Sequence, residues 1–213
     1  MRKVAIGILA ILSSFWISSL QAEEFVEGKH YRLLEKPLPV VLEQGKKVAV
    51  WEYFSYLCGH CFTFEGPVTS WAAKQAPEVQ FEQVPAVFNS AMLPGAQTYY
   101  ALQLMGVDKD HRVSQGIYDS IHLSKAPAKN LAQYTTLVSK YGVDGDSFEK
   151  MANSFAVNIK VNQAKTATFN ARLEGTPSVL VAGKYMVISN NYVPGHQAVL
   201  AVVDQLIARE LAK

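Results

Sequence analysis

Both cysteines of the chain lie in one four-residue motif, Cys58-Gly59-His60-Cys61. An apolar run ends at Phe54, just before this motif, and a helical pattern begins at Cys58. Two cysteines three positions apart in the first turn of a helix bring their sulfur atoms within reach of a disulfide bond. The spacing therefore predicts a cysteine pair that can be oxidised and reduced.

The start of a helix favours the thiolate form of the first cysteine, Cys58. Backbone N–H groups and the positive end of the helix dipole point outward there. His60 can donate a hydrogen bond or a positive charge to the same sulfur, and Gly59 places no side chain over it. A motif that stabilises its own dithiol oxidises other thiols. We expect Cys58 to attack and be attacked, and Cys61, deeper in the helix, to resolve the mixed disulfide.

Three other roles for the cysteine pair are open. A structural disulfide across two residues closes a loop too small to constrain the unfolded chain strongly. A zinc site needs about four ligands, and the other histidines are scattered without ligand spacing, so we expect no metal. The third role is an inert pair of buried thiols. We favour redox exchange with other proteins, because the chain has no third cysteine to oxidise. The only cofactor expected is the redox-active Cys58–Cys61 disulfide itself.

Two further features accompany the motif. Glu52 interrupts the apolar strand predicted over Val48–Phe54. A buried carboxylate is costly unless it is paired, and here it could take the proton of Cys61 as the disulfide forms. The alternative is an exposed acid at a strand edge. Thr176-Pro177 precedes a later strand, where proline is sterically allowed, so this pair alone indicates little.

The predicted elements alternate between strands and helices. Strand patterns cover residues 48–54 and 79–87, and a hairpin through Gly183-Lys184 joins 178–182 to 185–188. Helical patterns cover residues 58–76, 95–105, 109–122, 128–141, 145–155, 157–173 and 196–212. Asp146 and Glu149 resemble a capping box for the helix over 145–155. This layout predicts an α/β domain interrupted by a helical insertion.

Residues 1–22 have the pattern of a cleaved secretory signal. A basic start, an apolar centre and a small residue, Ala22, precede acidic residues; the alternative is a retained membrane anchor. The short signal with a lysine indicates the bacterial periplasm. Without Arg2 and Lys3, 18 basic residues balance 18 acidic ones. A neutral mature chain is a poor candidate for binding nucleic acid, where Lys and Arg neutralise phosphates.

Together, these residues resemble the DsbA family of thioredoxin-fold oxidases of the bacterial periplasm. The resemblance rests on the signal, the strand with Glu52, the cysteine motif, the helical block and Thr176-Pro177, and it covers roughly residues 23–213. It implies a thioredoxin fold with an inserted all-helical domain. The implied domains, after the signal at 1–22, are a thioredoxin domain over 23–88 plus 165–213 and a helical insertion over 89–164.

The resemblance also implies an activity and its partners. The family consists of protein thiol:disulfide oxidoreductases that donate a disulfide to unfolded or reduced secreted proteins through a shallow apolar groove. A quinone-linked inner-membrane protein, DsbB-like, reoxidises them. By similarity, Pro177 is the cis-proline that faces the cysteine pair, and the Thr176 backbone pairs with an incoming substrate strand.

Two other functions are open for the same motif. One is a disulfide isomerase or reductase, and the other is a chaperone-like module that binds unfolded chains. Isomerases of this kind usually carry a dimerisation domain, and no segment is left over for one, so we expect a monomer.

Two positions depart from the family pattern. Gly59 stands where many members carry proline, and Gly-His is the dipeptide of eukaryotic protein disulfide isomerases, which is consistent with a weaker oxidant. Gln83 falls near the place of a buried lysine that accompanies the acid in the best-known members. A proton relay through Glu52 therefore lacks its usual partner.

Overall fold

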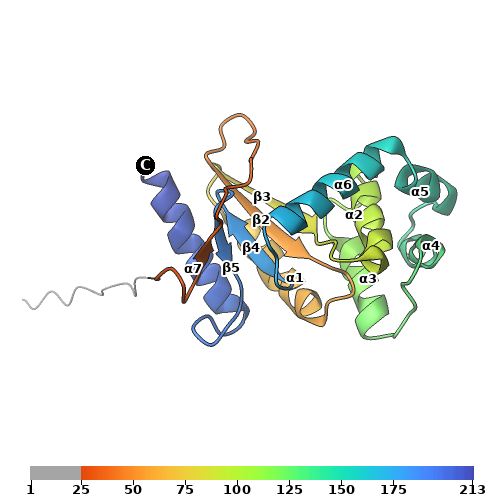
Figure 1. The fold of residues 1–213 in the computed structure, drawn as a ribbon. Coiled ribbons are helices and arrows are strands. Elements are labelled where there is room, and N and C mark those ends of the chain that lie inside the picture. The colour runs from red at the N-terminus through yellow and green to blue at the C-terminus, as the bar shows by residue number, and fades with distance from the viewer. Residues whose placement is uncertain (1–24) are drawn as a thin grey trace, which may run out of the picture.

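A computed structural model describes residues 25–213 (Figure 1), so the signal predicted over residues 1–22 lies outside the described residues. The strands are β1 (Arg32–Leu33), β2 (Val48–Phe54), β3 (Val79–Pro85), β4 (Ser178–Val181) and β5 (Tyr185–Val187). The helices are α1 (Gly59–Ala72), α2 (Leu93–Met105), α3 (Arg112–His122), α4 (Leu131–Ser139), α5 (Gly145–Ala152), α6 (Phe155–Asn170) and α7 (Gly195–Leu211). A 3-10 turn, η1 (Ser90–Met92), leads into α2. Within residues 25–213, no helix is long and apolar enough to cross a membrane.

The five strands form one mixed sheet in the order β1-β5-β4-β2-β3. Strand β2 lies inside the sheet, parallel to β3 and antiparallel to β4, while β1 pairs antiparallel with β5 at the edge. A strand flanked on both sides and covered on both faces is buried along most of its length, which explains its nearly continuous apolar run. The buried strand predicted at Val48–Phe54 is confirmed.

Helices cover both faces of the sheet. On one face, Val48 and Val50 of β2 pack in a cluster with Phe64 of α1 and with the apolar side of α7. On the other face, Tyr53 belongs to a cluster that includes residues of α2, α3 and α6. Figure 1 shows α2 to α5 gathered at the end of the molecule away from α7. The predicted α/β fold with an inserted block of helices is confirmed.

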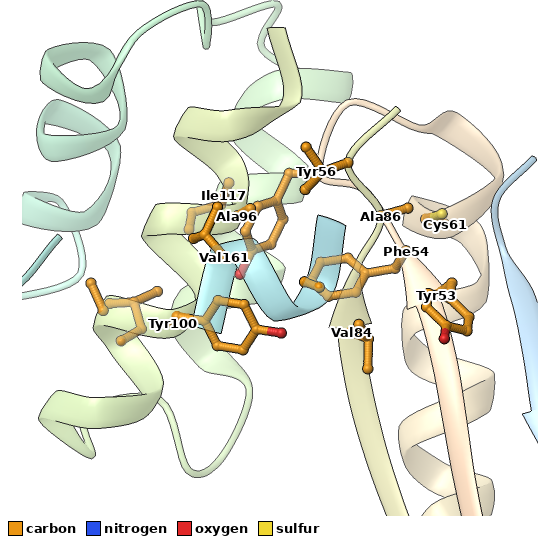
Figure 2. Close-up of a cluster of buried hydrophobic side chains, with 14 of the residues drawn as sticks. Tyr53, Phe54, Tyr56, Cys61, Val84, Ala86, Ala96, Tyr100, Ile117 and Val161 are labelled. Carbon is orange, nitrogen blue, oxygen red and sulfur yellow. The ribbon is translucent and has the colours of Figure 1, made fainter. Parts of the chain in front are cut away.

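The sheet and the inserted helices share one apolar core (Figure 2). Phe54, at the end of β2, lies between them, and its ring centroid is 5.3 Å from that of Tyr56 and 5.1 Å from that of Tyr99. Ile117 of α3 belongs to the same cluster, and Cys61 of α1 lies at its sheet side. The second cysteine is therefore placed where the two parts of the protein meet.

Helix α6 links the helical block to the sheet. It packs against α2 and α5 and also contacts β3, and it runs unbroken through residue 164, where the insertion was predicted to end. Arg32 of β1 donates two hydrogen bonds, each 2.7 Å, to the carbonyls of Ala171 and Arg172 just beyond α6. The sequence pattern did not reveal β1, yet this short edge strand holds the end of α6.

One predicted helix cap differs from the structure. The capping box predicted at Asp146 is wrong, because α5 is capped by Asp144, whose Oδ1 accepts a 2.9 Å hydrogen bond from the Ser147 backbone N–H. Asp146 lies in the first turn, where a carboxylate also suits the helix dipole. The hairpin of β4 and β5 is confirmed.

Gly116 provides a test of how α3 packs in the helical block. A Cβ atom here would overlap the Tyr141 ring, whose hydroxyl donates a 3.2 Å hydrogen bond to the Gly116 carbonyl. We expect Gly116→Ala to lower the free energy of unfolding by about 1–3 kcal/mol, the usual cost of overpacking. In a Tyr141→Ala background the same change should instead stabilise by about 1 kcal/mol, because alanine favours helix. Urea unfolding of the four proteins measures both values, and a destabilising effect in both backgrounds would contradict this explanation.

Candidate active site

The first cysteine of the motif is the N-cap of α1. Cys58 has an extended backbone, and its Sγ accepts a 3.4 Å hydrogen bond from the Cys61 backbone N–H. The same sulfur lies 3.2 Å from the backbone carbonyl oxygen of Thr176, 118 positions later in the chain. The Thr176-Pro177 peptide bond is cis. The helix start and the loop before β4 therefore meet at one sulfur atom.

The surroundings of Cys58 favour its thiolate. The pKa of Cys58 is lowered to about 5, and the largest cause is a hydrogen bond from the Cys61 side chain. Thr176 and the backbone N–H groups of the first turn lower it further, whereas the half-burial of Cys58 opposes the shift. Most of Cys58 is therefore ionised at neutral pH. A sulfur that is reachable and ionised is a good nucleophile and a good leaving group.

The second cysteine has the opposite properties. Cys61 is fully buried, and this burial raises its pKa far above that of a free thiol, with further contributions from Cys58 and from the charge of Glu52. Its thiol keeps its proton at neutral pH. Two cysteines three residues apart thus differ strongly in acidity and in exposure to solvent. A disulfide-exchange site requires this asymmetry.

Glu52 lies behind the cysteines in the interior of the protein. It is completely buried on the central strand β2, so the alternative of an exposed acid at a strand edge is wrong. Burial, reinforced by the charge of Glu65, raises the pKa of Glu52 to about 8. The carboxyl is therefore largely protonated at pH 7, and one of its oxygens, Oε1, has no hydrogen-bond partner among the described residues.

Sequence patterns did not single out Glu65 as a site residue. The Gln83 side-chain amide donates to Glu52 Oε2 and to Glu65 Oε2, both at 2.9 Å. Glu65 follows Cys61 by one helical turn, so the two share the buried side of α1. That spacing is the signal from which Glu65 could have been found. Gln83 had been identified only as the residue near the place of a lysine.

Within residues 25–213, no hydrogen bond joins the His60 side chain to Cys58, and Gly59 has no side chain to offer one. The His60 side chain is exposed, and it is the His60 backbone that lowers the pKa of Cys58. The charge of His60 instead lowers the pKa of His196 on α7, after the effect of burial. Gly59 has open space where a Cβ would stand, so this backbone accommodates a side chain there.

Comparison with known proteins identifies the family. Residues 49–206 match the model of the DsbA-like thioredoxin domain. The chain belongs to this family. The matched segment runs from β2 to α7 and includes both the cysteine motif and Thr176-Pro177, and the family shows that the protein is a thiol:disulfide oxidoreductase.

Individual relatives extend the match to the full chain. The chain is 32% identical to the thiol:disulfide interchange protein DsbA of Pseudomonas syringae pv. tomato over 213 residues, which are 100% of this chain and 97% of the relative. It is 33% identical to DsbA of Burkholderia cepacia over 81% of each chain. Among solved structures, DsbA E82I of Pseudomonas aeruginosa has a TM-score of 0.83 at 30% identity, covering 89% of this chain and 100% of that one. DsbA of Xylella fastidiosa has a TM-score of 0.80 at 31% identity, covering 88% and 98%.

The acidity of Cys58 can be tested in the reduced protein. We expect its thiolate to titrate with a midpoint near pH 5, seen as absorbance at 240 nm. The variant Cys61→Ala should move the midpoint upward, because the Cys61 hydrogen bond is the largest influence on that pKa. An unchanged midpoint would mean that the backbone N–H groups alone hold the thiolate.

The same acidity predicts how stability depends on pH. A lowered pKa stabilises the folded reduced protein fully above the pKa of an unfolded cysteine, about 8.5, and this contribution is lost as pH falls toward about 5. The oxidised protein has no such thiol. We therefore expect thermal melts to show a reduced form that is the more stable above neutral pH, with an advantage that shrinks on acidification. A more stable oxidised form at neutral pH would point to a structural disulfide.

Proposed function

We propose that the protein is a periplasmic protein-disulfide oxidase that donates the Cys58–Cys61 disulfide to folding secreted proteins. The observation that carries this proposal is the difference between an ionised, reachable Cys58 and a protonated, buried Cys61. Stabilising the Cys58 thiolate stabilises the reduced dithiol over the disulfide, so the disulfide form is the better oxidant.

The exchange proceeds in two steps. A substrate thiolate attacks Cys58 Sγ in the oxidised protein, forming a mixed disulfide and breaking the Cys58–Cys61 bond, and Cys61 leaves as a thiolate. The second substrate thiolate then attacks the substrate sulfur of the mixed disulfide and releases Cys58 as a thiolate. Two electrons pass from the substrate dithiol to the cysteine pair, and the substrate gains one disulfide.

Glu52 supplies the proton that the departing Cys61 needs. Its raised pKa, about 8, leaves it protonated at neutral pH, while the still higher pKa of Cys61 makes that thiolate a strong base. Proton transfer from Glu52 to Cys61 is therefore favourable when the disulfide opens. The reverse transfer accompanies reoxidation, when Cys61 again loses its proton.

The substrate and the reoxidising partner follow from the family. Substrates are unfolded or reduced secreted proteins, whose backbone pairs with Thr176 beside the cis peptide bond of Pro177. The Thr176 carbonyl, 3.2 Å from Cys58 Sγ, stands where such a strand would align its own cysteine. A quinone-linked inner-membrane protein takes the two electrons from the reduced pair. The predicted export signal would place the protein in the periplasm, where both partners occur.

Replacing the first cysteine tests whether the motif carries the activity. We expect Cys58→Ser to abolish the oxidation of a reduced, unfolded substrate, because no sulfur remains for attack. The matched variant Cys61→Ser should instead accumulate the mixed disulfide through Cys58, visible by mass spectrometry and reversed by a reductant. Oxidation by Cys58→Ser at the rate of the unmodified protein would show that the motif does not carry the activity.

The equilibrium of the cysteine pair with a glutathione buffer separates an oxidase from a reductase. An oxidase should remain mostly reduced at glutathione ratios that keep ordinary structural disulfides oxidised. The measurement is the fraction of reduced protein across a series of buffer ratios, read by thiol alkylation. A strongly reducing potential would favour the reductase, and efficient repair of scrambled disulfides without net oxidation would favour the isomerase.

A further inference from the structure

The acids behind Cys61 belong to a chain of polar groups that crosses from the thioredoxin part into the helical insertion. Glu52 of β2 and Glu65 of α1 both accept from the Gln83 amide of β3, and we call these three residues the acid cluster. Beyond them, Nδ1 of His111 lies 3.3 Å from Glu65 Oε1. His111 directly precedes α3 of the insertion. The chain of polar groups therefore runs from the cysteine side of the sheet to the helical block.

The acid cluster has two carboxyl groups and no cation of its own. Gln83 is a neutral amide that offers N–H donors but no charge. Burying a carboxylate costs free energy unless a charge or donor offsets it. Among the described residues, the one ion pair recorded for either acid is that of Glu65 with His111. When it is protonated, His111 therefore supplies a positive charge that offsets Glu65.

Other ionisable groups face the cluster, and most of them add negative charge when ionised. On the cysteine side these are Cys58 and Cys61, after β2 it is Tyr56, and from α2 and α3 they are Tyr99 and Tyr118. Asp108 and Asp110 lie beside His111, and Lys109 lines the same cavity of about 220 Å³ as His111 and Asp108. Lys109 has no ion pair with either acid of the cluster.

The backbone of His111 is held in an uncommon conformation. Its φ of 58° is left-handed, a region that residues with a side chain rarely adopt. The Asp108 carboxylate accepts hydrogen bonds from the Val113 and Ser114 backbone N–H groups, at 2.6 and 2.9 Å, and so fixes the turn. Such outliers gather at functional positions. Here the turn aims the imidazole at Glu65.

His111 also connects a buried group to water. The Glu65 side chain is 3% exposed, whereas that of His111 is 44% exposed. The imidazole can therefore exchange its proton with solvent while it lies within ion-pair distance of a buried side chain. Its contact with Glu65 raises the pKa of His111 above the usual value near 6.5, against a smaller opposing effect of burial.

We propose that His111 is a positioning residue of the redox site, whose positive charge neutralises Glu65 and so sets how readily Glu52 exchanges a proton with Cys61. The proposal rests on the proposed function and adds to it a contribution from the helical insertion. Without the cation, the charge of Glu65 would act on Glu52 unopposed, and the acid cluster would release its protons only at higher pH.

The sign of the pH effect follows from the raised pKa of His111. A histidine whose pKa rises on folding stabilises the protein fully below its unfolded pKa, about 6.5, and this contribution is lost as pH rises through the folded value. The ion pair is therefore complete in mildly acidic conditions and is lost in alkaline ones. As it is lost, Glu52 becomes a weaker proton donor to Cys61.

Three variants of the full-length reduced protein test the proposal. His111→Asn removes the charge with a side chain that tolerates a left-handed backbone. His111→Lys keeps a positive charge at this position between pH 5 and pH 10. Lys109→Gln is the matched control, since it removes one positive charge two positions away. The measurement is the titration of glutamate side-chain carboxyl carbons by NMR from pH 5 to 10, with Glu52→Gln used to assign the signal.

We expect the Glu52 carboxyl to titrate near pH 8 in the unmodified protein and in Lys109→Gln. His111→Asn should raise this midpoint by up to about one pH unit, because the fraction of His111 that is still protonated there no longer opposes the charge of Glu65. His111→Lys should hold it at or below the unmodified value. A midpoint that does not move in His111→Asn, or that moves equally in Lys109→Gln, would overturn the proposal.

Two further measurements keep the outcome decisive. Oxidation of a reduced, unfolded substrate is assayed in parallel: its absence in the unmodified protein would overturn the proposed function, whereas intact oxidation with an unmoved carboxyl midpoint would overturn only the role of His111. Should His111→Asn fail to fold, the imidazole itself is titrated in the unmodified protein and in Glu65→Gln. A His111 pKa above 6.5 that falls in Glu65→Gln supports the proposal, and equal values contradict it.

Discussion

The hydrogen bond from the Cys61 backbone N–H to the Cys58 sulfur ties the chemistry of this protein to its backbone. Because Cys58 is the N-cap of α1, the groups that begin the helix are also the groups that stabilise its thiolate. The central strand β2 places the helix start, and β4 places the Thr176 carbonyl against the same sulfur. The sheet order and the helix start together decide which cysteine reacts.

The interior behind the motif sets a second constraint. A fully buried thiol and a fully buried carboxyl lie on neighbouring elements; burial makes ionisation of both harder, and the charge of Glu52 adds to this effect at Cys61. In the reduced protein the thiol holds its proton, and the carboxyl is the nearest acid to exchange a proton with it when the disulfide opens or closes. The same arrangement needs a link to water, and the contact of Glu65 with the partly exposed His111 supplies one.

Sequence patterns predicted the features that depend on neighbours along the chain. The cysteine spacing, the apolar strand and the helical periods each lie within one element, and their positions agree with the structure to within a few residues. The convergence of Glu65, Gln83 and His111 joins three elements, and no spacing in the sequence encodes it. Strand β1 is only two residues long, too short to show alternation. The sequence also does not show that the His60 ring is exposed, because this depends on the direction in which the side chain leaves the start of the helix.

Residues that meet in the site come from distant parts of the chain. Cys58 and Thr176 are 118 positions apart, and β1 near the start of the described chain pairs with β5 near its end. Contacts that close such large loops form more slowly than local helices. Because a polypeptide is synthesised from its N-terminus, both thiols emerge well before the segment that faces them. The reagent is thus complete only when the C-terminal part of the chain has joined the sheet.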